Sequence, residues 1–304
     1  MGAGSIALDY AKGDIMQTIG VIGAGQMGAG IAQVSAASGH AVLLCDVDLA
    51  RAEAGKAGIA KALARLVAKE KMTAGDAEAL LARITPVADH AAFAPCELVI
   101  EAATEREEVK RAIFASVGAH LSSTAILATN TSSIPITRLA QAAPDAARFI
   151  GVHFFNPVPV MGLIELIRGL ATSADTLAAV EAFGRRLGKE IVHAHDAPGF
   201  IVNRVLMPMI NEAAFALGEG VASMRDIDTA CRLGLNHPMG PLTLADFIGL
   251  DTCLEIIRVL QHGTGDPKFR PAPLLVQYVE AGWTGKKSGR GFYDWTEAEP
   301  VPTR

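Results

Sequence analysis

One glycine-rich stretch, residues 19–46, constrains the fold of this chain more than any other segment. It begins with an apolar run rich in β-branched residues, from Thr18 to Ile22. Three glycines then follow at G-x-G-x-x-G spacing: Gly23, Gly25 and Gly28. A helix-forming segment and a second apolar run come next, and the second run ends at Asp46. The pattern predicts a buried strand, a tight turn, a helix and a second strand.

The three glycines and the acid match what a dinucleotide needs from a protein. Gly23 permits the tight turn, Gly25 allows the backbone to approach a pyrophosphate, and Gly28 allows close packing of helix on strand. The helix N-terminus, where Gln26 and Met27 lie, offers N–H groups and the positive end of the helix dipole to the phosphates. A glycine-rich turn without a ligand is the alternative, but the flanking strand and helix, and an acid 23 residues after Gly23, disfavour it.

Asp46 indicates which dinucleotide binds. Its carboxylate would accept hydrogen bonds from the adenosine ribose hydroxyls, and its charge would repel a 2′-phosphate. The next residues, Val47 and Asp48, include no arginine that could neutralise such a phosphate. The sequence therefore favours NAD over NADP as the cofactor.

Composition excludes several classes of function. A chain of 304 residues is long enough for two domains. Its net charge is −5 and its basic residues are scattered, which disfavours a nucleic-acid surface. The four cysteines form no C-x-x-C pair, as expected for reduced, buried thiols in a cytoplasmic protein. Residues 112–137 carry no formal charge, but polar side chains interrupt them, so no membrane span is predicted. Residues 1–15 are predicted to be a flexible extension.

Further apolar runs predict the rest of an α/β domain. Four of them have the length and composition of strands: Leu98–Ala102, Ala125–Ala128, Phe149–Phe155 and Leu163–Ile167. Residues 106–116 are predicted to be a helix, and residues 49–84 a helical hairpin interrupted at residues 73–76. Alternating strands and helices favour a Rossmann-like, doubly wound parallel sheet that binds its ligand at the strand C-termini.

A domain boundary is predicted near the sequence DAPG at residues 196–199. We therefore expect an NAD-binding domain at residues 16–198 and an all-α domain at residues 199–304. Its expected helices are residues 200–218, 223–233, 241–260 and 272–281. This second domain is unusually apolar, which favours a hidden partner surface and, most simply, a homodimer. The apolar residues concerned are Met207, Met209, Ile210, Phe215 and Leu217.

His153 is the strongest candidate for acid–base chemistry. It lies in an apolar run, where a histidine is more often a satisfied core residue than a catalytic one. Glu165, however, lies across the bend 156–159 in an equally apolar run, where a charge needs a partner. A carboxylate on one ring nitrogen would orient the imidazole and make the other nitrogen a base.

Three further features each have a structural and a functional interpretation. Ser132, just past a predicted strand, could cap the next helix or contact a ligand. Asn203 could make an ordinary interdomain hydrogen bond or hold a substrate. The basic residues Lys61, Arg65 and Lys69 share one helix face, which could be merely solvated or could bind an anion. No metal site is predicted, because His193 and His195 lack further ligands nearby.

Several segments in order carry a resemblance to a known family. They are the glycine fingerprint with its acid, ATNTSS, GVHFFNPVPVMGLIELI, DAPGFIVNRV, NHPMGPLTLADFIGLD and GKKSGRGFYDW. Together they cover about residues 17–295 and resemble the L-3-hydroxyacyl-CoA dehydrogenase family, most closely its bacterial 3-hydroxybutyryl-CoA dehydrogenases. The resemblance implies an NAD-dependent oxidoreductase that interconverts (S)-3-hydroxyacyl-CoA and 3-oxoacyl-CoA, with a short-chain acyl-CoA as substrate.

The resemblance also implies roles for individual residues. His153 would be the general base and acid, and Glu165 the carboxylate that orients it. Ser132 and Asn203 would hold the substrate's oxygens, and Lys69 would contact coenzyme A. Four residues match further cofactor contacts: Glu105, Lys110, Asn156 and Lys287. Two positions depart from the family, because Arg106 stands where an asparagine is common and Gly162 where a lysine is common.

Two other functions remain open at this stage. A sugar-acid dehydrogenase of the L-gulonate 3-dehydrogenase type would use the same fold and catalytic residues without coenzyme A contacts. A non-catalytic NAD-binding or structural protein of crystallin type would need neither base nor substrate. The presence of Ser132, His153, Glu165 and Asn203 together argues against the second alternative.

Overall fold

The computed structural model describes residues 16–304, so the extension predicted at residues 1–15 lies outside the described residues. The chain divides between Asp196 and Ala197 into two compact units, which are described separately. The first contains an eight-stranded sheet in the order β3-β2-β1-β4-β5-β6-β7-β8. Its strands are β1 (Thr18–Ile22), β2 (Ala41–Cys45), β3 (Ile84–Val87), β4 (Leu98–Glu101), β5 (Ile126–Thr129), β6 (Phe149–Phe154), β7 (Leu163–Arg168) and β8 (Glu190–His195).

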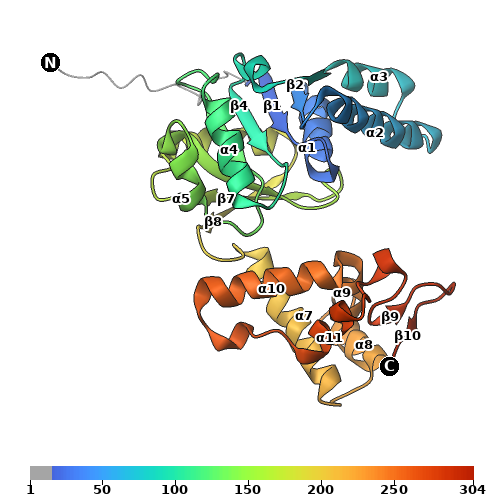
Figure 1. The fold of residues 1–304 in the computed structure, drawn as a ribbon. Coiled ribbons are helices and arrows are strands. Elements are labelled where there is room, and N and C mark those ends of the chain that lie inside the picture. The colour runs from blue at the N-terminus through green and yellow to red at the C-terminus, as the bar shows by residue number, and fades with distance from the viewer. Residues whose placement is uncertain (1–15) are drawn as a thin grey trace. The chain divides into compact units, whose positions relative to one another are not determined.

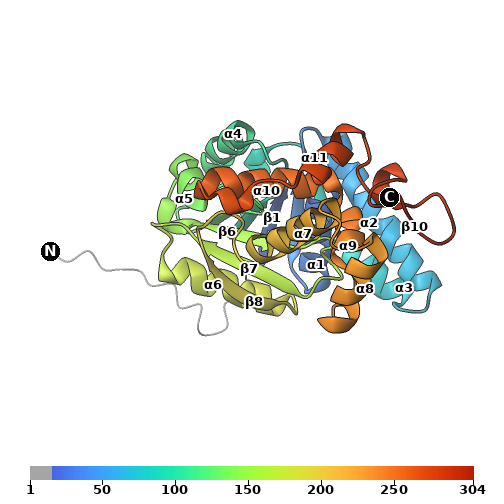
Figure 2. The ribbon, with the colours of Figure 1, turned by 90° about the horizontal axis from the view of Figure 1, so that it is seen from below.

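Helices cover both faces of this sheet, which confirms the predicted doubly wound fold. One face packs on α1 (Gln26–Ala37), α2 (Leu49–Ala68), α3 (Ala74–Ala82) and α6 (Ala174–Arg186). Two helices, α4 (Glu107–Gly118) and α5 (Ile136–Leu139), lie on the opposite face, and Figure 2 shows the sheet between α4 and α1. Short 3₁₀ turns complete the unit: η1 (His90–Phe93), η2 (Ala140–Ala142) and η3 (Ala146–Arg148). The central strands are buried on both faces, which explains their continuous apolar runs.

The sheet is parallel, as predicted, except at one position. Strand β7 pairs antiparallel to β6, and β8 follows β7 in parallel. The bend at residues 155–162 is too short for the crossover that a parallel neighbour would need, so the chain returns as a hairpin. This reversal places His153 directly opposite Glu165 in the strand register.

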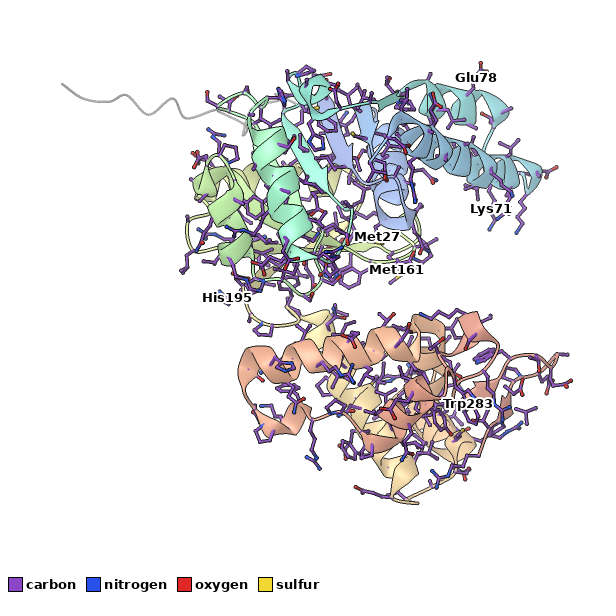
Figure 3. All side chains as sticks on the ribbon, in the orientation of Figure 1. Met27, Lys71, Glu78, Met161, His195 and Trp283 are labelled. Carbon is purple, nitrogen blue, oxygen red and sulfur yellow. The ribbon has the colours of Figure 1, made fainter. Side chains whose placement is uncertain are left out.

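The hairpin of α2 and α3 is confirmed, but its end was predicted too far along the chain. Ile84 begins strand β3 rather than ending a helix. β3 pairs only with β2 and forms one edge of the sheet, and edge strands tolerate a proline such as Pro86. In Figure 3, Lys71 and Glu78 mark the turn and the second helix of this hairpin.

The second unit is helical, as expected, and Figure 1 shows its helices grouped around α7. They are α7 (Val202–Gly218), α8 (Met224–Gly234), α9 (Pro241–Ile248), α10 (Leu250–Thr264) and α11 (Pro273–Glu280), with 3₁₀ turns η4 (Pro267–Phe269) and η5 (Lys286–Ser288). The single helix predicted at residues 241–260 is two helices. Gly249 between them has φ +103°, a backbone conformation that a right-handed helix cannot contain.

The expectation of a purely α-helical second domain also needs a small correction. Strands β9 (Tyr293–Asp294) and β10 (Val301–Pro302) form a short antiparallel ribbon. The buried carboxylate of Asp246 on α9 accepts hydrogen bonds from the backbone N–H groups of Phe292 (2.9 Å) and Tyr293 (2.8 Å). Burial raises the pKa of Asp246, and these bonds compensate part of the cost of burying its charge.

Most of the apolar residues that the sequence singled out on α7 do not form an exposed partner surface. Met207, Ile210 and Leu217 are buried in the unit's own core, and Phe215 packs against that core. Other residues carry the exposed large apolar side chains of this unit, among them Val205 on α7, and Leu233 and Leu235 at the end of α8. No helix among residues 16–304 is both long and apolar enough to cross a membrane.

Candidate active site

The glycine-rich loop has the geometry that its sequence predicts. Gly23 has φ +98°, and its N–H donates to Cys45 O at 2.8 Å, which ties the turn to the end of β2. A Cβ atom at Gly28 would lie 1.7 Å from Gly23 O, so only glycine allows this helix to start so close to the strand. At Gly25 a Cβ would meet nothing within 4 Å. The loop therefore presents open backbone at the position where a phosphate is expected.

Asp46 is fixed against this loop. One carboxylate oxygen accepts from Ala24 N at 2.6 Å, and the other accepts from Val47 N at 2.7 Å. A carboxylate has about four lone-pair positions, so both oxygens can still accept from a ligand. Asp46 also lines both of the cavities described below, which places its charge where a dinucleotide's ribose is expected.

The first cavity, of about 560 Å³, lies between the glycine-rich loop, α1, α2 and the bend 156–159. Asn156, which the resemblance assigns to the cofactor, is part of its wall. The second cavity, of about 420 Å³, lies between the end of β2, η1 and α4. Figure 3 shows Met27 of α1 and Met161 of the bend at the same edge of the unit. Both cavities adjoin the C-terminal ends of the parallel strands β1 and β2, where a doubly wound sheet is expected to bind its ligand.

His153 and Glu165 form the pair that the sequence predicted. The ring nitrogen Nδ1 of His153 lies 2.7 Å from Oε2 of Glu165, and the two side chains are 6% and 0% exposed. A buried carboxylate needs a hydrogen-bond donor, and the imidazole supplies it through Nδ1–H. This bond leaves Nε2 as the nitrogen with a lone pair, and Nε2 lies 3.0 Å from Ser132 Oγ.

Ser132 does not cap the following helix, which was its structural alternative. The first N–H groups of α5, from Ile136 and Thr137, instead donate to the Asp196 carboxylate at 2.8 and 2.7 Å. The Ser132 hydroxyl is directed to His153. Ser132, His153 and Glu165 therefore form one continuous hydrogen-bonded chain, in which a proton at Nε2 of His153 could pass to or from a substrate oxygen.

Glu105 organises the loop that carries Ser132, a function that the sequence did not reveal. Its Oε1 accepts from Thr131 Oγ1 (2.7 Å), Ser132 N (2.9 Å), Ser133 N (3.0 Å) and Ser133 Oγ (2.7 Å). The only indication of this role in the sequence was that Glu105 is an acid shortly after the end of a predicted strand. Its assignment as a cofactor contact stays a prediction, and the hydrogen bonds add a positioning role for the serine loop.

The side chain of Lys110 is buried beneath the loop that carries Ser132 and is not on the surface of that loop. Its side chain is 2% exposed, and its ammonium contacts Glu101 Oε2 at 2.7 Å and Glu105 Oε2 at 3.7 Å. Glu101 is fully buried and also accepts from Thr129 Oγ1 at 2.7 Å. The cofactor contact implied for Lys110 stays a prediction, while the buried network supports the ends of β4 and β5.

Lys189 is a further residue near the site that the sequence did not single out. It is buried, burial lowers its pKa, and its ammonium donates to the carbonyl oxygens of Val158 (2.8 Å) and Met161 (2.6 Å). No ion pair to Lys189 occurs within residues 16–304. The lysine therefore fixes the bend between His153 and Glu165 through two backbone acceptors.

Replacing Lys189 by methionine is expected to destabilise the protein. Each buried acceptor left without a donor costs about 1–3 kcal/mol, so the melting temperature should fall by several degrees. Replacement by arginine retains the charge and the donors, and should cost less. Thermal unfolding followed by circular dichroism is the measurement. If methionine and arginine at position 189 give the wild-type melting temperature, the bend does not depend on this contact.

Asn203 and Lys287 belong to the second unit. Asn203 is buried near the start of α7, at 8% exposure, and Lys287 in η5 lies 2.7 Å from Asp251. The first unit alone brings Ser132, His153 and Glu165 together.

The two residues that depart from the family pattern, Arg106 and Gly162, are both exposed. Arg106 is the N-cap residue of α4, and a Cβ atom at Gly162 would meet nothing within 4 Å. The absence of a side chain at position 162 is therefore not imposed by packing.

Within residues 16–304, no group of three or more His, Cys, Asp or Glu side chains is arranged to hold a metal ion. Of the two histidines on β8, His193 contacts Glu181 at 3.0 Å.

Comparison with known proteins gives consistent results for both units. Residues 18–197 match the family described as 3-hydroxyacyl-CoA dehydrogenase, NAD binding domain, and residues 199–295 match its C-terminal domain. A 3-hydroxybutyryl-CoA dehydrogenase of Bradyrhizobium diazoefficiens is 54% identical, with 95% of this chain and 99% of the relative covered. The crystal structure of (S)-3-hydroxybutyryl-CoA dehydrogenase from Ralstonia eutropha has a TM-score of 0.91 and 49% identity, covering 93% of this chain and 100% of that chain.

Proposed function

Since the chain belongs to the 3-hydroxyacyl-CoA dehydrogenase family, we propose that it interconverts (S)-3-hydroxyacyl-CoA and 3-oxoacyl-CoA with NAD and NADH. Short-chain substrates such as 3-hydroxybutyryl-CoA are favoured, because relatives that are 50–54% identical carry that name. The hydrogen-bonded chain of Ser132, His153 and Glu165 is the observation that carries this proposal, since oxidation of a secondary alcohol needs a base at the hydroxyl.

The hydrogen bonds of Ser132, His153 and Glu165 support their proposed roles, and the family resemblance supports the role of Asn203. Nε2 of His153 takes the proton of the substrate's 3-hydroxyl group, and returns it when a 3-oxo group is reduced. Glu165 accepts from Nδ1–H, fixes the ring orientation and stabilises the protonated imidazole. Ser132 and Asn203 hold the substrate oxygen. Bound NAD supplies the acceptor for the hydride that leaves C3.

The residues of the glycine-rich loop fit NAD. Gly25 leaves open backbone for a pyrophosphate, and the carboxylate of Asp46 lies beside the loop as an acceptor for ribose hydroxyls. We assign NAD rather than NADP because the charge of Asp46 disfavours a 2′-phosphate. The proposed cofactor contacts are Gly23, Gly25, Gln26, Met27, Gly28, Asp46, Glu105, Lys110, Asn156 and Lys287.

A spectrophotometric assay tests the activity directly. Oxidation of NADH with acetoacetyl-CoA should be fast, longer 3-oxoacyl-CoAs should compete less well, and free 3-oxo or sugar acids should react poorly. Preferential turnover of a free sugar acid would favour the L-gulonate 3-dehydrogenase type of activity instead. Tight NAD binding without any turnover would favour a non-catalytic protein.

A basic face on the helical hairpin is the proposed contact for coenzyme A. Lys61 and Arg65 lie on α2 and Lys69 caps its end, all three are exposed, and none makes an ion pair within the described residues. Unpaired cations on one face suit the 3′-phosphate and pyrophosphate of coenzyme A.

Lys69→Glu should therefore raise the KM for acetoacetyl-CoA several-fold, because one exposed charge contact contributes about 0.2–1 kcal/mol and reversal adds a repulsion of similar size. The effect should shrink with added salt. The KM for NADH should not change. An N-acetylcysteamine thioester lacks the phosphates and serves as the control substrate. Equal losses with both thioesters would show that this face does not bind coenzyme A.

We also propose a homodimer in the cytoplasm. The exposed apolar side chains of Val205, Leu233 and Leu235 in the second unit support a protein partner, and a second copy is the simplest one. Burial raises the pKa of the Cys45 and Cys96 thiols to about 11 and about 12, as suits unreactive thiols in a reducing compartment. Sedimentation equilibrium tests the dimer, and a monomeric mass at assay concentrations would contradict it.

A further inference from the structure

The amide side chain of Asn130 joins two segments of the candidate active site where the backbone ladder between them has ended. Asn130 follows β5 directly and is buried. The last residue of β5 in that ladder is Thr129, which pairs with Gly151 of β6. Further along β6, the N–H of Phe154 donates to Oδ1 of Asn130 at 2.8 Å. The side chain thus supplies the acceptor that the backbone of β5 no longer provides.

This bond lies beside the contact between Ser132 and His153. Ser132 comes two residues after Asn130, and His153 directly precedes Phe154. Oγ of Ser132 lies 3.0 Å from Nε2 of His153. Apart from that contact, no other hydrogen bond in the described part of the chain joins residues 130–133, the serine loop, to β6. The position of the serine loop relative to β6 therefore depends on the Asn130 side chain.

The other hydrogen bonds of the site hold each side of this contact separately. Glu165 of β7 lies 2.7 Å from Nδ1 of His153 and fixes the imidazole from the side away from the loop. The backbone N–H of Asn130 donates to Glu101 O at 2.7 Å, and Glu105 accepts from the rest of the serine loop. These bonds attach the loop to β4 and to the residues after it. Neither set attaches the loop to β6.

We propose that Asn130 is a positioning residue for the reaction. By holding the N–H of Phe154, its amide oxygen sets the distance between Ser132 Oγ and His153 Nε2. Both groups have to lie within hydrogen-bond reach of the same substrate oxygen, and a misplacement of about 1 Å can lower a rate by about 10²-fold. The expected effect on rate rests on the proposed function, whereas the contact between Ser132 and His153 can be measured without turnover.

Two substitutions remove the acceptor. Asn130→Leu retains about the size of the side chain, and Asn130→Ala shortens it. Each should lower kcat with acetoacetyl-CoA by about 10-fold, while the KM for NADH changes by less than about 2-fold, because the proposed ribose and pyrophosphate contacts lie on the glycine-rich loop. Each should also lower the melting temperature by about 2–5 °C, since a buried N–H loses its partner. Wild-type kcat in either folded variant would overturn the inference.

Asn211→Leu is the matched control, because Asn211 makes the same kind of bond within the second unit. It is buried on α7, and its Oδ1 accepts from Ala272 N at 2.8 Å. This variant should lose at least as much melting temperature as Asn130→Leu, but its kcat should stay within about 2-fold of wild type. Equal losses of kcat in the two variants would show that Asn130 affects activity through stability alone.

A Ser132→Ala background isolates the contact through which Asn130 is proposed to act. In that background, Asn130→Leu should lower kcat by less than about 2-fold further, because the contact is already lost. The fall in melting temperature should be the same as in the wild-type background. If Asn130→Leu lowers kcat by the same factor in both backgrounds, it does not act through Ser132 and His153.

A spectroscopic measurement separates this inference from the proposed function. In protein with isotope-labelled histidine, the nitrogen chemical shift of His153 Nε2 reports its hydrogen bond with Ser132, and the signal is the one missing from His153→Gln. Ser132→Ala should shift this signal, and Asn130→Leu should shift it in the same direction. If the signal shifts in this way but wild type reduces no 3-oxoacyl-CoA, the proposed activity fails while the role of Asn130 stands. If Asn130→Leu leaves the signal unmoved, the inference fails whatever the activity.

Discussion

Replacing His153 by glutamine is expected to lower kcat by about 10²- to 10⁴-fold, the usual contribution of a positioned general base. Glutamine has a similar reach and can still donate to Glu165, so the hydrogen bond at the buried carboxylate need not be lost. It can neither take the proton of the 3-hydroxyl group nor donate one to the oxygen of a 3-oxo group. The measurement is kcat with saturating acetoacetyl-CoA and NADH, together with NADH affinity and melting temperature, which should stay close to wild type.

Glu165→Gln is the companion variant. It should also lower kcat, because an amide neither fixes the ring tautomer nor stabilises an imidazolium in the way that a carboxylate does. Since the two residues form one hydrogen-bonded unit, the double variant should lose less than the product of the single effects. Near-native kcat in a folded His153→Gln protein would remove His153 from the catalytic role.

The second large effect concerns the cofactor. Asp46→Asn combined with Val47→Arg is expected to change the ratio of kcat/KM for NADH over NADPH by about 10²-fold or more in favour of NADPH, because juxtaposed like charges cost several kcal/mol. Asparagine is preferred to alanine at position 46, because its oxygen can still accept from Ala24 N and hold the loop. Val47 is 84% exposed, so arginine fits there without disturbing the core.

Single variants separate the two contributions. Val47→Arg alone adds a phosphate partner but leaves the repelling carboxylate, and should shift the ratio much less. Asp46→Asn alone removes the repulsion and should weaken NADH binding. An unchanged ratio in the double variant would show that Asp46 does not lie at the ribose.

The sequence by itself determined the features that depend on local patterns. The spacing of Gly23, Gly25 and Gly28 between an apolar strand and a helix identified the nucleotide loop, because only glycine allows this turn and this close packing. Continuous apolar runs identified most central strands, since those strands are buried on both faces. The motif around His153 and Glu165 identified the family and predicted the hydrogen-bonded pair that these two side chains form. The edge strand β3 was missed, because its four residues include a proline and follow directly on a helix.

Only the tertiary structure decided how distant segments meet. Nothing local predicts that Glu105 supports the Ser132 loop, or that Lys189 fixes the bend through two carbonyl oxygens. These contacts join residues from 27 to 31 positions apart in the chain. Their geometry follows from sheet order and register, which are set by packing of the whole domain. Periodicity therefore identifies which residues are buried, whereas the position of each hydrogen-bond partner becomes definite only when the strands align.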